Sequence, residues 1–192
     1  MKSIQFLTIL LSIGILLYSC SKDDECIIDP SLEGSSSEIT ELASDHHRVY
    51  TDIVINASLT EVWDVLTDFD NMSSWSTSFQ GLTGDISDGG QVVAIFIFPD
   101  PVTGNPTQGE YPHTLIYSEG VEFGWSDPIL GIDGITDNHF FRVEMISECQ
   151  TRFINVDEYS GTDPNITTEI VANTVLGSFN QFNAELKAEI EK

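Results

Sequence analysis

The sequence predicts an α+β domain in which a curved antiparallel β-sheet wraps around a long C-terminal α-helix, with two short helices after the first strand. Three observations predict this class. A strand-like segment at 49–56 is followed directly by a helix-like segment at 58–69. Several segments of alternating polarity lie between 91 and 156, and an apolar stripe at helical spacing runs from 166 to 192. A run of strands followed by a helix is typical of folds in which the helix covers one face of a sheet.

The first strand and the helices after it are predicted from local patterns. Residues 49–56 alternate between polar and apolar side chains, as a half-buried strand does. Ser58 and Glu61 have the spacing of a capping box, so Ser58 is predicted to cap a helix. A second short helical turn is predicted at 72–75. The apolar positions of the first helix recur at helical spacing, at Val62, Trp63, Leu66 and Phe69.

The rest of the chain is dominated by strand signals until the last helix. Residues 81–90 read as a turn-rich link and 99–112 as a long loop, because glycine and proline punctuate them. The final segment, 166–192, has an apolar stripe wide enough to lie on a sheet. The predicted strands are 91–98, 114–117, 121–125, 140–146 and 151–156, and the stripe comprises Val171, Val175, Phe179, Phe182, Leu186 and Ile190.

The N-terminal region predicts export and anchoring. Residues 1–19 have a charged Lys2 and an apolar run too short to span a membrane, which indicates a signal peptide. Leu17-Tyr18-Ser19-Cys20 resembles a lipobox, so Cys20 is the predicted lipidation site and the membrane anchor. An ordinary signal peptide or an uncleaved anchor is the alternative. The predicted location is that of an outer membrane lipoprotein, and the sequence leaves open whether it faces the periplasm or the cell surface.

Residues 20–45 are predicted to be an acidic flexible tether, and 46–192 the folded domain. The stretch 31–38 is rich in Ser, Gly and Glu and offers little to bury. A short ordered N-terminal extension is the alternative, which Ile27 and Ile28 leave open. The folded part has the size of one domain, which we expect to be a monomer.

Charge and cysteine content narrow the classes of partner. The chain has a net charge of −24, and no Lys or Arg lies between Arg48 and Arg142. Nucleic acid is therefore a poor partner, because binding it requires cations that neutralise phosphates. Cys26 and Cys149 would form a disulfide in an oxidising compartment, although Cys26 lies in the predicted tether. No metal-binding or nucleotide-binding motif is present, and no cofactor is expected.

Five stretches, in this order, resemble the SRPBCC superfamily of START-like helix-grip proteins and, within it, the polyketide cyclase/dehydrase-like group. The resemblance covers nearly all of 46–192. It implies the helix-grip fold and a cavity for a small, largely apolar ligand between the sheet and the C-terminal helix. It does not imply a reaction, because folds host many functions. The stretches are INASLTEVWDVLTDFDNMSSWS (55–76), FGWSDP (123–128), HFFRVE (139–144), TRFINVDEYSG (151–161) and FNQFNAELKAEIEK (179–192).

His139 begins the apolar face of a strand, which raises the question of its partner. If residues 147–149 form a three-residue hairpin loop, His139 faces Asp157 and Phe141 faces Asn155 on the inner side of the sheet. His139 and Asp157 would then form a general acid/base pair, in which the carboxylate raises the imidazole pKa and burial opposes that rise. A structural pair, a two-residue slip that brings Tyr159 opposite, and a histidine in water at the cavity mouth are the alternatives.

Other candidate ligand contacts share the sheet. Trp125 and Phe123 alternate with Gly124 and are predicted to point inward, as core or as ligand platform. Tyr117 and His113 share a face with Tyr111 and Leu115, and the pattern does not decide whether that face is inner or outer. Asn183 of the last helix is a weaker candidate. The candidate ligand-binding set is therefore His113, Tyr117, Phe123, Trp125, Phe141 and Asn155.

Three functions remain open at this stage. The first is a protein that binds or carries a small hydrophobic or amphipathic molecule. The second is an enzyme of the cyclase/dehydratase type, in which His139 and Asp157 exchange a proton with a carbonyl-bearing ligand. The third is a surface interaction protein with an acidic face and a vestigial cavity. A well-packed interior without a pocket would favour the third function.

Overall fold

Two antiparallel sheets form most of the structure, a computed structural model that describes residues 26–99 and 105–192. The larger sheet has the strand order β1-β2-β9-β8-β7-β6, and the smaller has the order β3-β4-β5. The larger sheet consists of β1 (Ser35–Ala43), β2 (His46–Ile55), β6 (Ile116–Ser118), β7 (Glu122–Pro128), β8 (Ile135–Ser147) and β9 (Gln150–Gly161). The smaller sheet consists of β3 (Phe79–Gly84), β4 (Gln91–Pro99) and β5 (Pro106–Thr114).

Among the described residues, two α-helices complete the fold, and both begin at capping residues. Helix α1 (Leu59–Thr67) begins at the capping box that Ser58 and Glu61 form, as predicted. Helix α2 (Thr168–Ile190) begins at Thr167, whose side chain accepts a hydrogen bond from the backbone of Ile170. Single 3-10 turns occur at η1 (Pro30–Leu32) and at η2 (Met72–Ser74), where the second short helix was predicted.

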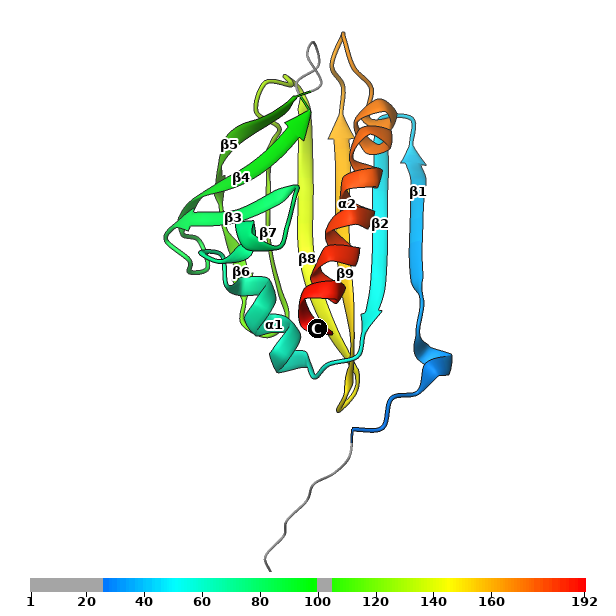
Figure 1. Cartoon of the computed structure of the whole chain (residues 1–192). Helices are drawn as coiled ribbons and strands as arrows, with labels where there is room; N and C mark the ends of the chain where they lie inside the picture. Colours follow the sequence, from blue (N-terminus) through cyan, green and yellow to red (C-terminus); the bar gives the residue numbers. More distant parts are fainter. Residues whose placement is uncertain (1–25, 100–104) are drawn as a thin grey trace, which may run out of the picture.

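Helix α2 lies along strands β2 and β9 of the larger sheet, and the smaller sheet stands beside it (Figure 1). The predicted α+β class, with a long C-terminal helix gripped by an antiparallel sheet, is confirmed. Among the described residues, no helix is both long and apolar enough to cross a membrane.

The buried side chains form two clusters at opposite ends of α2. One joins α1 and the central strands to Phe182 and Leu186 in the second half of the helix. The other joins Val49, Tyr159 and Val171 near the start of the helix. The interior between the two clusters is not filled by side chains, and this is where the candidate site lies.

Strands β3 and β5 correct two of the predictions. Residues 81–90 and 99–112 were expected to be a link and a loop, yet β3 extends to Gly84 and β5 begins at Pro106. Gly81 has a φ of +113° and lies at a bulge in β3. The glycine that was interpreted as part of a turn therefore allows a bulge within a strand. Strand β5 tolerates proline because it is the edge strand of the smaller sheet.

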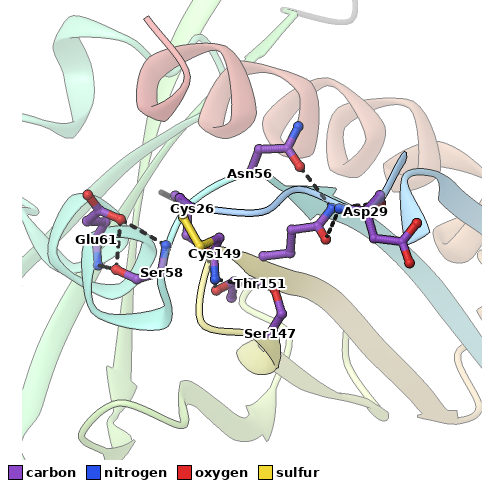
Figure 2. The surroundings of a disulfide bond; sticks show 10 residues. Cys26, Asp29, Asn56, Ser58, Glu61, Ser147, Cys149 and Thr151 are labelled. Carbon is purple, nitrogen blue, oxygen red and sulfur yellow. Dashed lines mark hydrogen bonds between the residues drawn. A yellow bond between two sulfur atoms is a disulfide. The ribbon is translucent and has the colours of Figure 1, made fainter. Parts of the chain in front are cut away.

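The segment before β2 is ordered, which corrects the predicted flexible tether for the residues described there. Residues Ser35–Ala43 form β1 and pair with β2, although most of their side chains are exposed. Cys26 and Cys149 form a disulfide, with their Cα atoms 5.6 Å apart (Figure 2). Beside it, the backbone N–H of Asp29 donates to Gln150 Oε1, and Gln150 Nε2 donates to the carbonyl of Asp29. The predicted signal peptide, 1–19, and lipidation site, Cys20, lie outside the described residues.

Candidate functional site

A cavity of about 280 Å³ lies between α2, the centre of the larger sheet and the inner face of the smaller sheet. Its volume is near the lower end of the range for small-molecule sites. Aromatic and aliphatic side chains make most of its wall, and polar groups gather at one end. The wall comprises Ser78, Phe79, Phe96, Phe98, Tyr111, His113, Trp125, Ile129, Leu130, Ile132, Asp137, His139, Phe141, Asn155, Asp157, Tyr159, Val171, Val175, Ser178, Phe179 and Phe182.

His139 lies on this wall in the backbone register that the sequence predicted. It faces Asp157 across the β8–β9 ladder, and Phe141 faces Asn155. The side chains add a partner that the register does not specify. His139 Nε2 lies 2.8 Å from Asn155 Oδ1, whereas its Nδ1 lies 3.8 Å from Asp157 Oδ2. The imidazole therefore hydrogen-bonds directly to the amide of Asn155 rather than to the carboxyl group.

Two aromatic rings hold the His139 imidazole in place. It stacks on Phe141, with ring centroids 4.5 Å apart, and on Phe179 of α2, at 4.8 Å. Burial is the main reason that the pKa of His139 falls to about 4, against the hydrogen bond that His139 donates to Asn155, which raises it. The rise was expected from the Asp157 carboxylate, but the effect that opposes burial comes from the hydrogen bond to Asn155, and burial is the stronger of the two. His139 is neutral at pH 7 and offers one donor and one acceptor nitrogen.

Two carboxyl groups lie at the polar end of the cavity. Burial raises the pKa of Asp157 well above its ordinary value, and the neighbouring Asp137 raises it further. Asp157 Oδ1 accepts a hydrogen bond from the backbone of Asn138 at 3.1 Å, and Tyr159 is a second partner. Burial also raises the pKa of Asp137 to about 6, although the hydrogen bond from Trp125 opposes this. These groups can hold protons near neutral pH, which ordinary carboxyl groups do not.

Trp125 connects the two sheets at this end. Its indole Nε1 donates to Asp137 Oδ2 at 2.9 Å. The ring of His113, from β5, stacks on the indole with centroids 4.2 Å apart, and His113 Nδ1 lies 2.7 Å from Asp127 Oδ1. Trp125 is 1 % exposed and also lines the cavity, so it is both a core residue and a wall of the site.

Comparison with known proteins places this fold and cavity in a family. The sequence profile described as polyketide cyclase / dehydrase and lipid transport matches residues 46–191. The chain belongs to this family. A search of curated proteins finds no match.

Solved structures of low sequence identity share the fold of this family member. The Zhui aromatase/cyclase from Streptomyces sp. R1128 is 12% identical with a TM-score of 0.55, over 76% of this chain and 94% of that one. A START superfamily protein from Mycobacterium smegmatis is 14% identical with a TM-score of 0.56, over 75% and 97%. The di-domain ARO/CYC protein BexL is 13% identical with a TM-score of 0.55, over 75% and 46%. At these identities the likeness shows the fold alone.

Two of the predicted ligand contacts do not reach the cavity of this family member, which corrects their assignment. Phe123 is fully buried and packs edge-on against Phe69, at 5.2 Å between centroids. Tyr117 packs against Trp63 of α1, at 5.7 Å. Both fill the core beneath α1, because that helix closes the interior at this end of the sheet. The inner-face alternative holds for His113, which lines the cavity.

Asn183, the weaker candidate of the last helix, does not line the cavity. Asn183 is buried in α2 and donates to Thr51 Oγ1 at 3.0 Å, away from the cavity wall. Within the described ranges, no group of three or more His, Cys, Asp or Glu side chains is arranged to hold a metal ion.

Sequence reasoning missed Asp137 and Tyr159 as site residues. Asp137 shares the odd-numbered inner face with His139, so the period-two pattern carried a signal for it. Tyr159 continues the same face of β9 beyond Asp157. The rings that β4 contributes, Phe96 and Phe98, had no such signal, because nothing in the sequence placed the smaller sheet against the larger one.

Proposed function

We propose that this protein binds a small hydrophobic or amphipathic molecule in the cavity between its sheets and α2. The observation that carries the proposal is a cavity with an apolar, largely aromatic wall and a few polar groups at one end. Apolar walls supply affinity, and a few placed polar groups orient a ligand. A cavity of this kind counts against the surface interaction protein with a filled interior. Membership of a family described by cyclase, dehydrase and lipid transport activities agrees with ligand binding.

The first test is to purify the protein from its native host, extract it with organic solvent and identify the extract by mass spectrometry. A single small molecule near one equivalent per chain is the expected result. A protein that is empty after every preparation, and that also fails to bind a neutral apolar probe such as N-phenyl-1-naphthylamine, would contradict the proposal.

A cavity-filling variant locates the binding. Val175 lines the cavity from α2, so Val175→Phe is expected to lower probe affinity about tenfold or more by occupying the ligand's space. The matched control is Val121→Phe, the same change at a loop position where the side chain is 47% exposed. Equal loss of binding in both variants, or in neither, would place the probe elsewhere. Circular dichroism checks that both variants fold.

An enzyme of the cyclase or dehydratase type is the second candidate. It is favoured by two carboxyl groups with raised pKa values beside a neutral His139, because a protonated Asp157 can act as a general acid. If the protein is an enzyme, Asp157→Asn should abolish turnover of the extracted molecule while leaving its affinity within a few-fold. In a carrier, that substitution should change affinity alone, with no turnover to lose.

The proposal includes anchoring through a lipid on Cys20, at the outer membrane. Support comes from the lipobox-like Leu17-Tyr18-Ser19-Cys20 and from a disulfide, which suits an oxidising compartment. Metabolic labelling with a palmitate analogue tests the anchor. The native chain should carry the label in the membrane fraction, and Cys20→Ser should not. A label that persists in Cys20→Ser, or an unlabelled native chain, would refute lipidation at this residue.

A further inference from the structure

The polar end of the cavity has acidic side chains but no permanently positive one. Asp137 and Asp157 line it, together with His113 and His139, and no Lys or Arg is among the lining residues. Buried carboxyl groups in proteins are normally paired with a cation or well supplied with hydrogen-bond donors. Of the nearest titratable groups, His139 is neutral and Asp127 is another carboxyl group. His113 lowers the pKa of Asp137 by its charge, but its Nδ1 lies 2.7 Å from Asp127 Oδ1 and is thus already paired with a carboxyl group.

One carboxyl oxygen of Asp137 has no hydrogen-bond donor among the described residues. Asp137 Oδ2 accepts the indole hydrogen of Trp125, but Asp137 Oδ1 is buried without a hydrogen bond among the described residues. Asp137 lies on the cavity wall, so a rotation of its carboxyl group would turn Oδ1 toward the cavity, where a ligand can supply the missing donor. Asp157, by contrast, already has Asn138 and Tyr159 as partners.

Aromatic rings surround the same space. Trp125 and Tyr111 each lie edge-on to Phe96, with centroids 6.3 and 6.0 Å away, and Tyr111 also lies edge-on to Phe98. Phe179 of α2 lines the opposite side, next to His139. The faces of aromatic rings attract cations, most strongly where water is excluded. The Trp125 indole is fixed to Asp137 by its hydrogen bond, which holds a ring and a carboxyl group together.

We propose that the ligand is an organic amine that binds as its ammonium form, with the positive charge at Asp137 and an apolar, ring-bearing body among the aromatic side chains. An ammonium group supplies the donor that Asp137 Oδ1 lacks and the permanent positive charge that the cavity wall lacks. This inference rests on the proposed function and names the chemical class of its ligand. The chain's net charge of −24 favours the approach of a cation.

The groups that face Asp137 determine how this binding depends on pH. They are His113 of β5, Asp127 of β7, His139 of β8, and Asp157 and Tyr159 of β9, and α2 adds no titratable group to the cavity wall. A bound ammonium favours the ionised form of Asp137, whose pKa is about 6 in the free protein. Binding near pH 6 should therefore release protons, and amine affinity should fall as the pH drops below 6.

Isothermal titration calorimetry with three matched ligands tests the inference. They share a naphthalene ring and differ in one group: 2-(2-naphthyl)ethylamine, 2-(2-naphthyl)ethanol and 2-naphthylacetate. At pH 8 we expect the amine to bind about tenfold more tightly than the alcohol, and the carboxylate most weakly. In Asp137→Asn the preference for the amine should shrink to about threefold or less, because the charge is lost while the Trp125 hydrogen bond keeps an acceptor. Asp133→Asn, an exposed charge in the turn just before β8, should keep the preference.

The native protein alone can overturn the inference, whether or not Asp137→Asn folds. An alcohol or carboxylate that binds as tightly as the amine would refute the amine class while leaving the proposed binding function intact. Absence of proton release for the amine near pH 6, measured in buffers of different ionisation enthalpy, would refute the role of Asp137. If none of the three ligands binds and no molecule is extracted from the native protein, the proposed function fails as well.

Discussion

Asp137 and Asp157 form the polar end of the cavity, and their burial lowers the stability of the fold. Asp157 is fully buried and Asp137 largely so, neither pairs with a Lys or Arg among the described residues, and burial is the main cause of the raised pKa of each. A carboxyl group whose pKa is higher in the folded chain than in the unfolded chain destabilises the fold once the pH exceeds the unfolded value. Groups of this kind persist where function requires them.

Asp137→Asn should therefore stabilise the protein at neutral pH. The pKa of Asp137 is about 6 in the fold and 3.8 in the reference state. The cost of ionising it is absent below pH 3.8, grows between the two values and is complete above 6. We expect the variant to gain on the order of 2 kcal/mol over the native chain at pH 8 and to lose that advantage toward pH 4.

Urea denaturation at both pH values measures this difference. His139 contributes with the opposite sign, because its lowered pKa makes the fold less stable on acidification, but it is present in both proteins and its effect cancels. Asp133→Asn, at an exposed position, should leave stability nearly unchanged at either pH. A destabilised Asp137→Asn at pH 8 would show that the carboxylate is better solvated than its burial implies.

At the scale of single residues, the sequence predicted where His139 would lie but not what it would contact. Strand alternation and the assumed three-residue loop at 147–149 gave its register with Asp157 correctly. The loop itself is shorter than expected: Ser147 pairs with Gln150, and a bulge between Met145 and Ser147 keeps the predicted register. The actual hydrogen bond, to Asn155, depends on side-chain rotamers and on the rings of Phe141 and Phe179, which fix the imidazole. Such contacts join residues from three elements, and no local pattern specifies them.

At the scale of elements, strong local signals predicted the strands and helices that carry them. The capping box of α1 and the apolar stripe of α2 are local features, and both helices were found. Strands β3 and β5 were missed because glycine and proline, which usually mark turns, here lie at a bulge and on an edge strand. Strand β1 was missed because most of its side chains are exposed, so its sequence lacks an apolar pattern. It is held to the fold mainly by backbone pairing with β2.

The disulfide gives the N-terminal segment a second attachment, at the turn between β8 and β9 (Figure 2). Cys26 and Cys149 are 123 residues apart in the sequence, so the bond closes a long loop in the unfolded chain. Reduction of the native protein should therefore lower its free energy of unfolding by about 3 kcal/mol. Guanidinium denaturation with and without a reductant measures the change.

Cys26→Ser is the matched control for reduction. It should be as unstable as the reduced native protein and should not respond to the reductant. The hydrogen bonds between Asp29 and Gln150 remain in both proteins, so the difference reports the covalent bond. A native protein that is equally stable with and without reductant would mean that the bond is absent or that it constrains the folded and unfolded states alike.

At the scale of the whole molecule, charge is distributed unevenly. The chain has 31 acidic and 7 basic residues, and its three arginines, Arg48, Arg142 and Arg152, point to the face of the larger sheet opposite the cavity. Two of them pair with carboxylates there: Arg142 with Glu122, and Arg152 with Asp52. The remaining acidic surface has few cations near it, and its mutual repulsion opposes the compact state.

Added salt should therefore stabilise this protein. Screening weakens repulsion between exposed charges, and the Debye length falls from about 30 Å at 0.01 M to about 8 Å at 0.15 M salt. We expect NaCl to raise the free energy of unfolding by on the order of 1 kcal/mol across this range, or Tm by about 3 °C.

Most of the rise should occur below 0.15 M, whereas a solvent-exclusion effect would grow steadily to molar concentrations. Thermal unfolding at a series of NaCl concentrations, with sucrose of equal osmolality as the control, separates the two. A Tm that falls with NaCl would show that the few ion pairs outweigh the acidic repulsion.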